Sequence, residues 1–395
     1  MSQTGDQAIH QDGSRGSAAT SGWLRGPWLF SARVDLSVFL GSAIVALALL
    51  PIGAGLGVLH GDSPEWTWVG AVLLIDIAHV WSTTFRVYLD RTELRRRFWL
   101  YVLVPVFAWV AGVALYSESK MLFWRVLAYM AVFHFVRQQY GWVALYRSRA
   151  GETGRHGRWL DTATIYAATV FPLLYWHAHL PREFWWFLPG DFAAISLDVL
   201  TVDVLTAVST AAEPVYWGLM ALYLGRSAYL WLRRGRGNPG KDIVVITTAL
   251  CWYIGIVALN SDYAFTVTNV IIHGVPYFAL IYWYGRKRYR DQASRSTNRA
   301  GRRMPGSPAL RVFSRGPWLF LAILWLVAYG EELFWDRVVW HDRAWLFGVG
   351  WDLETVHLFL VPLLALPQAT HYILDGFIWR RRDNPDVARA IAMDG

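Results

Sequence analysis

The chain has 395 residues, of which 55% are hydrophobic and 16% aromatic, and it carries 24 tryptophans and a formal net charge of +8. Several apolar runs reach the length that crosses a bilayer, so the composition predicts a polytopic membrane protein. The basic residues lie in short connections between these runs, a pattern that sets membrane topology and argues against nucleic-acid binding. The single cysteine, Cys251, excludes an intramolecular disulfide, a thiolate zinc site and a Cys-x-x-Cys-His haem attachment.

The two ends of the chain are polar. Residues 1–24, rich in Ser, Gly, Gln and Asp, lack the apolar core of a signal peptide and predict a disordered cytoplasmic tail. We expect a single transmembrane domain over residues 25–380 and a second cytoplasmic tail over 381–395. Inside that domain, the Gly-, Ser- and Pro-containing segment 286–315 predicts a basic and mobile inner loop.

Ten apolar segments predict transmembrane helices, so the expected fold is an all-α integral membrane helix bundle. They lie near residues 35–59, 66–86, 98–116, 121–146, 160–179, 214–232, 242–260, 262–285, 317–334 and 356–379. Arginines are frequent after the even-numbered segments and sparse after the odd-numbered ones. This alternation predicts that both termini are cytoplasmic and that the protein is a multi-pass protein of the inner or plasma membrane.

Two connections on the face opposite the predicted cytoplasmic one are long and aromatic. One begins at Glu183 and the other at Phe334. We expect both to lie flat in the membrane interface, where tryptophan is favoured, or to cover a site.

Four of the predicted spans carry a histidine in their interior. These are His79, His134, His273 and His371, and all four fall on even-numbered spans. Counted at 1.5 Å per residue, they lie roughly 10–20 Å from the basic residue at the inner end of each span. Because polar groups in hydrocarbon normally face the interior of a bundle, we expect the four imidazoles to converge on one site.

A polar side chain lies three or four residues from each histidine and therefore on the same helix face. The pairs are Asp76 with His79, Gln138 with His134, Asn269 with His273, and Asp375 with His371. Asp76 and Asp375 are expected to be further metal ligands or to hold the second imidazole nitrogen. Gln138 and its neighbour Arg137 are the candidate catalytic residues, with Arg137 holding an anionic head group or balancing a carboxylate.

A single histidine in a membrane helix is more often a hydrogen-bonding group than a ligand. Four at one depth, each with a polar companion, favour a metal site instead. Neutral imidazoles with carboxylates suit Fe, Zn, Cu or Mn rather than Mg or Ca. The leading prediction is therefore a membrane oxidoreductase or oxygenase with a mono- or dinuclear, non-haem iron centre. Its expected partners are a lipid, acyl or isoprenoid substrate, oxygen and an electron donor.

Two alternatives stay open. The first is a haem b protein, in which two of the histidines clamp the haem for electron transfer. The second is a transporter, in which the polar layer conducts protons or ions. The clustered His-x3-His and His-x2-His-His boxes of membrane desaturases and hydroxylases are absent. Only the general plan, single histidines on several helices, resembles membrane carotenoid-cleaving oxygenases.

Overall fold

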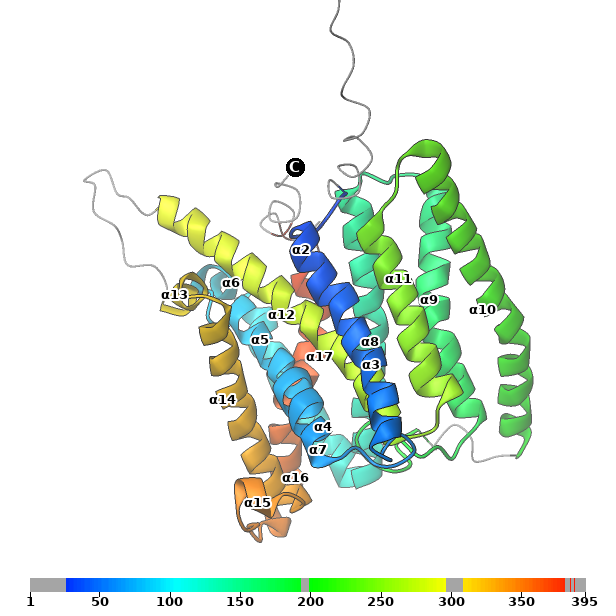
Figure 1. The fold of residues 1–395 in the computed structure, drawn as a ribbon. Coiled ribbons are helices and arrows are strands. Elements are labelled where there is room, and N and C mark those ends of the chain that lie inside the picture. Colours follow the sequence, from blue (N-terminus) through cyan, green and yellow to red (C-terminus); the bar gives the residue numbers. More distant parts are fainter. Residues whose placement is uncertain (1–25, 193–198, 296–307, 381–383, 385–386, 388–395) are drawn as a thin grey trace, which may run out of the picture.

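The structure is a computed structural model that describes residues 26–192, 199–295, 308–380, 384 and 387. Helices are its only regular elements within these residues, and they form one bundle (Figure 1). The predicted all-α class is therefore confirmed. The predicted tail 1–24 and most of the predicted tail 381–395 lie outside the described residues.

The helical segments follow one another as α2 (Ala32–Asp35), η1 (Leu36–Gly41), α3 (Ser42–Gly55), α4 (Glu65–Thr67), η2 (Trp68–Ile77), α5 (Ala78–Arg86), α6 (Arg91–Arg96), α7 (Phe98–Glu118), α8 (Lys120–Arg149), α9 (Arg155–Ala178), α10 (Val199–Arg234), α11 (Pro239–Trp252), η4 (Tyr253–Ala258), α12 (Asp262–Arg295), α13 (Pro308–Ser314), α14 (Pro317–Trp335), η5 (Asp336–Trp340), α15 (Ala344–Phe347), η6 (Glu354–Val356), α16 (His357–Leu364) and α17 (Leu366–Ile378). Many are continuous with their neighbours, so η1 and α3, or η2 and α5, form single rods.

Seven helical stretches of the described residues are long and apolar enough to cross a membrane. They are Ala32–Gly55, Glu65–Arg86, Phe98–Glu118, Pro239–Ala258, Asp262–Asp291, Pro317–Trp340 and Glu354–Ile378. The other three predicted spans lie in α8, α9 and α10, which are 30, 24 and 36 residues long but fall outside this apolar set. Ten crossings, the orientation of the termini and the kind of membrane therefore stay predictions.

Helices α5, α8, α12 and α17 form the centre of the bundle. Helix α12 packs against α3, η2 and α5, and helix α17 packs against α5, α7 and α8. In Figure 1, α14 lies at the left edge and α10 at the right edge, on either side of this centre. Helix α2 begins and α17 ends at the same end of the bundle, which we call the upper end; α15 lies at the lower end.

Two predicted segments differ from the structure. The span 356–379 is broken, because α16 ends at Leu364 and α17 begins at Leu366 with a proline in its first turn, where the missing N–H is tolerated. The loop 286–315 is helical at both ends, since α12 continues to Arg295 and α13 begins at Pro308. An ion pair between Arg288 and Asp90 ties this extension of α12 to the bundle. Residues 296–307 lie outside the described residues.

A buried ion cluster joins α8, α9, α10 and α11 at the upper end. Asp161 on α9 has no exposed surface and accepts hydrogen bonds from Arg147, from Arg226 at 3.0 Å and from Lys241 at 3.0 Å. Lys241 also donates to Glu152 at 2.6 Å. Breaking a buried ion pair by removing one partner is strongly destabilising, because the remaining charges are left uncompensated.

We expect Asp161→Asn to lower the free energy of unfolding by about 3–5 kcal/mol, because three cations then lose their shared counter-charge. Thermal and chemical unfolding of the purified protein in detergent measures this loss. The control is Glu65→Gln, which breaks the more exposed pair with Arg343 and should change stability by less than about 1 kcal/mol. Equal effects of the two substitutions would contradict the assignment of Asp161 as a buried anchor.

Candidate metal centre

The structure brings the four imidazoles together at the centre of the bundle. His79 lies on α5, His134 on α8, His273 on α12 and His371 on α17, and each residue is at most 3% exposed. Neighbouring ring centroids are 4.7 Å apart for His79 and His273, 5.1 Å for His273 and His134, 4.5 Å for His134 and His371, and 5.0 Å for His371 and His79. The rings of His79 and His134 face each other across this circle at 6.5 Å.

Their Nε2 atoms meet in two pairs. The Nε2 atoms of His79 and His273 are 3.1 Å apart, and those of His134 and His371 are also 3.1 Å apart. Two nitrogens bound to one metal ion at about 2.0–2.1 Å lie roughly 2.9–3.4 Å from each other at bond angles of about 90–110°. His79, His134 and His273 also offer three nitrogens that all lie within 4.8 Å of one another. The arrangement therefore fits a metal-binding group.

The residues next to the histidines let the helices pack closely and hold the rings in place. Gly274 follows His273, and a Cβ atom at this glycine would lie 2.5 Å from the Cγ2 atom of Ile75, so only glycine permits α12 to pack against η2 here. Asp76 lies near the end of η2, a π-helical segment that continues directly into α5. Such widened turns are frequent at functional sites. Phe135 stacks on the ring of His273 with centroids 3.5 Å apart and holds it in place.

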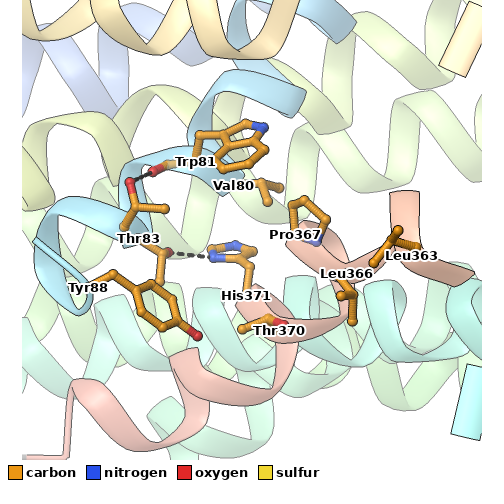
Figure 2. Close-up of a pocket in the computed structure, with 10 residues that line it drawn as sticks. Val80, Trp81, Thr83, Tyr88, Leu363, Leu366, Pro367, Thr370 and His371 are labelled. Atoms are coloured by element: carbon orange, nitrogen blue, oxygen red, sulfur yellow. Dashed lines mark hydrogen bonds between the residues drawn. The ribbon is translucent and has the colours of Figure 1, made fainter. Parts of the chain in front are cut away.

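A chain of hydrogen bonds determines which nitrogen of His371 carries the proton. The Tyr277 hydroxyl donates to Asp375 Oδ1 at 2.7 Å. Its oxygen then accepts the hydrogen of Thr83, 3.1 Å away. The Thr83 oxygen in turn accepts from His371 Nδ1 at 2.8 Å (Figure 2). With Asp375 ionised and Thr83 donating to Tyr277, His371 carries its hydrogen on Nδ1, and its Nε2 is then an acceptor.

The carboxylates of Asp76 and Asp375 face the Nδ1 atoms of His79 and His134. Asp76 Oδ1 is 3.5 Å from His79 Nδ1, and Asp375 Oδ2 is 3.7 Å from His134 Nδ1. Neither of these two contacts is a hydrogen bond, so the Nε2 atoms of His79 and His134 can each act as donor or acceptor. The facing Nε2 atoms of His134 and His371 either share one hydrogen or present their lone pairs to a bound cation.

Of the four predicted companions, only Asp76 faces the histidine of its own helical rod. Asp375 faces His134 instead of His371, and Gln138 Nε2 donates to the carbonyl of His273 at 2.8 Å. Asn269 donates to the Phe265 carbonyl at 3.0 Å, within its own helix. Spacing of three or four residues predicted the helix face, but Asp375 and Gln138 reach neighbouring helices that the sequence does not place.

Arg137 lies outside the ring of imidazoles. It is exposed, it donates to the Tyr166 hydroxyl, and its guanidinium carbon lies 4.9 Å from the centroid of the Tyr140 ring. Among the described residues, its contacts are thus with tyrosines, and the expected balance with Asp76 or Asp375 is not formed.

Sequence reasoning missed three residues that hold the centre: Thr83, Tyr277 and Trp379. Trp379 Nε1 donates to Asp375 Oδ1 at 2.7 Å. Each of the three follows a site residue by four positions, Thr83 after His79, Tyr277 after His273 and Trp379 after Asp375. A search for hydroxyl and indole groups at this spacing, beside the carboxylates and amides, would have found them.

Three cavities reach the centre from different sides. The lateral cavity, of about 280 Å³, reaches His371 and is lined mainly by apolar side chains of α5, α16 and α17 (Figure 2). The lower cavity, of about 490 Å³, reaches Asp76, and its walls include Trp186 and Trp340 from the two predicted aromatic connections. The upper cavity, of about 510 Å³, reaches His134 and Asp375.

No known protein family, curated protein or solved structure matches this chain. The geometry therefore defines the class by itself: a protein with apolar helices able to span a membrane and a buried histidine group, His79, His134 and His273, that can bind a metal ion.

We expect Tyr277→Phe to lower the free energy of unfolding by about 1–2 kcal/mol, because Asp375 and Thr83 both lose a buried partner. The matched control is Tyr282→Phe on the same helix, whose hydroxyl makes a long contact of 3.5 Å to the Phe313 carbonyl. Tyr282→Phe should lower the free energy of unfolding clearly less than Tyr277→Phe does. Thermal unfolding in detergent compares the two, and a neutral Tyr277→Phe would contradict the hydrogen-bond chain.

Proposed function

We propose that the protein is a membrane-embedded oxygenase in which His79, His134, His273 and His371 hold non-haem iron. The observation that carries this proposal is the meeting of four buried imidazoles, whose Nε2 atoms lie 3.1 Å apart in each of two pairs. Two neutral imidazoles share a hydrogen bond only when one of the facing nitrogens carries a hydrogen, and a bound cation replaces that hydrogen. The chain from Asp375 through Tyr277 and Thr83 favours a hydrogen on Nδ1 of His371, which leaves its Nε2 able to bind a metal ion.

Iron suits this set better than zinc or copper for a chemical reason. Four imidazole ligands close a tetrahedral zinc site, whereas an ion that accepts six ligands keeps two positions for oxygen and substrate. Iron in such a nitrogen-rich site supports the activation of oxygen. His79, His134 and His273 offer three nitrogens within 4.8 Å of one another, which supports an ion shared by these three, and His371 Nε2 lies 3.1 Å from that of His134.

A hydrophobic substrate is supported by the lateral cavity. Val80, Trp81, Leu363 and Leu366 line it, and His371 lies at its inner side (Figure 2). A lipid, acyl chain or isoprenoid matches such an apolar lining. In the overall balance, R–H, O2, two electrons and two protons give R–OH and H2O, so an electron donor is a required partner for hydroxylation.

The haem alternative is disfavoured by the packing of the rings. A haem held by two of these histidines needs a flat macrocycle between them. The neighbouring rings, whose centroids are only 4.5–5.1 Å apart, fill that space. An intense visible absorption band from the purified protein would reverse this argument.

The transporter alternative has one supporting observation. Tyr372 lines both the lower cavity and the upper cavity, so the polar centre borders openings toward both ends of the bundle. If the protein conducts protons or ions, flux into liposomes should depend on Asp76 or Asp375. Flux that is unchanged by Asp76→Asn and Asp375→Asn would remove this alternative.

Purified protein is expected to retain about one iron ion per chain, and the iron content of His134→Ala should be at least about ten times lower. The matched control is His177→Ala, because His177 is bonded to Tyr129 and the Leu173 carbonyl, outside the centre. Elemental analysis and the optical spectrum measure both variants. A metal-free preparation that is fully active would end the proposal.

The hydroxyl of Thr83 should matter for metal affinity. We expect Thr83→Val to weaken iron binding about 10–100-fold, because His371 then loses the acceptor that orients its ring. Thr83→Ser keeps the hydroxyl and should retain the affinity. Competition with a chelator measures both, and equal affinities in the two variants would show that the hydrogen bond does not support the metal.

A further inference from the structure

The upper cavity combines an apolar wall with two arginines. Its lining includes Arg137 and Arg380, together with Phe133, Leu145 and Leu280. The volume of about 510 Å³ is that of a small-molecule site, since ligand pockets commonly measure about 300–1,000 Å³. We infer that this cavity binds an anionic amphiphile, whose head group contacts the two arginines and whose chain lies along the apolar wall.

The two arginines supply the charge for such a head group. Both are exposed, and among the described residues neither forms an ion pair with a carboxylate. Arg137 donates to Tyr166, and the guanidinium of Arg380 lies 4.8 Å from the centroid of the Phe377 ring. Arg137 lies on α8 and Arg380 follows the end of α17, so both cations border the apolar wall of the cavity. Guanidinium groups match carboxylate and phosphate oxygens in charge and geometry.

The other ionisable groups do not compete for this anion's place. Asp375, the carboxylate in the lining, already accepts hydrogen bonds from Tyr277 and Trp379 and faces His134. Its negative charge thus lies on the histidine side of the cavity. The arginines therefore determine where an anionic group is favoured.

The wall indicates how the chain of the amphiphile lies. Phe133 precedes Arg137 by four residues, hence on the same face of α8, and it is 65% exposed. The cavity thus reaches an apolar surface of the bundle beside the cation. Arg137 is three residues from His134, about 4.5 Å along the helix axis. A bound head group would place the nearby part of its chain beside the metal centre, and in this respect the inference rests on the proposed function.

The other two cavities lack this complementarity. The lower cavity contains the carboxylates of Asp76, Asp262, Glu332 and Asp342, which repel an anion. Its arginine, Arg343, is already paired with Glu65. The lateral cavity contains no charged side chain. Charge therefore selects the upper cavity for the head group.

The test compares three ligands of similar chain length on purified protein in a neutral detergent: oleate, oleoyl lysophosphatidate and oleyl alcohol. Binding is measured by calorimetry and by native mass spectrometry. We expect both anions to bind at least about tenfold more tightly than the alcohol, because charge-assisted hydrogen bonds to arginine are strong. Binding of oleate alone would support a fatty acid as the ligand, and preferred binding of lysophosphatidate would support a lipid phosphate.

Arg137→Gln should weaken binding of the anions by about tenfold or more and leave the alcohol unchanged, while Arg137→Lys should restore part of the affinity. The matched control is Arg125→Gln on the same helix, because Arg125 contacts the Gly190 carbonyl, away from the upper cavity. Arg380→Gln provides a second variant if Arg137→Gln does not fold.

Equal binding of the alcohol and the anions to the wild type, or equal losses in Arg125→Gln and Arg137→Gln, would overturn the inference. Metal content is measured in the same samples and separates the two proposals. Protein that lacks iron and cannot be loaded with it, but still prefers the anions, would support this inference and count against the iron proposal. Iron-loaded protein without that preference would overturn the inference and leave the metal centre in place.

Discussion

The constraint on which the centre depends is the direction of its hydrogen bonds. Asp375 accepts from Tyr277, Tyr277 accepts from Thr83, and Thr83 accepts from His371, so one carboxylate determines the tautomer of a ring on the other side of a tyrosine. The same carboxylate faces His134 through its second oxygen. Asp375 is thus connected to both rings of this pair, directly to His134 and through two hydroxyl groups to His371. The buried group of His79, His134 and His273 beside it can bind a metal ion.

The bundle makes this polar centre tolerable among apolar helices. The four histidines come from α5, α8, α12 and α17, which surround them so that none is more than 3% exposed. Helix α8 falls outside the apolar set of candidate spans, and its His134, Gln138 and Gln139 are buried. At the upper end, the ion cluster around Asp161 joins α8 to α9, α10 and α11. The position of α8 is thus supported far from the metal centre.

The cavities divide the surroundings of the centre by polarity. The lateral cavity is apolar, the lower cavity carries several carboxylates and the upper cavity carries two arginines. Each reaches a different part of the same group, at His371, Asp76 and His134 respectively. A neutral chain, a cation and an anion would therefore be favoured in different places around the same buried group.

The all-α class, the apolar helices and the four histidines were evident from the sequence, because helical length, hydropathy and the cost of a polar group in hydrocarbon are local properties. Helical spacing also placed Asp76 beside His79 correctly. Contacts between helices were not local. The pairing of Asp375 with His134, the role of Thr83 and Tyr277, and the break between α16 and α17 were decided by how the helices pack. Only the tertiary structure could show them, since helix faces carry no information on which neighbour they meet.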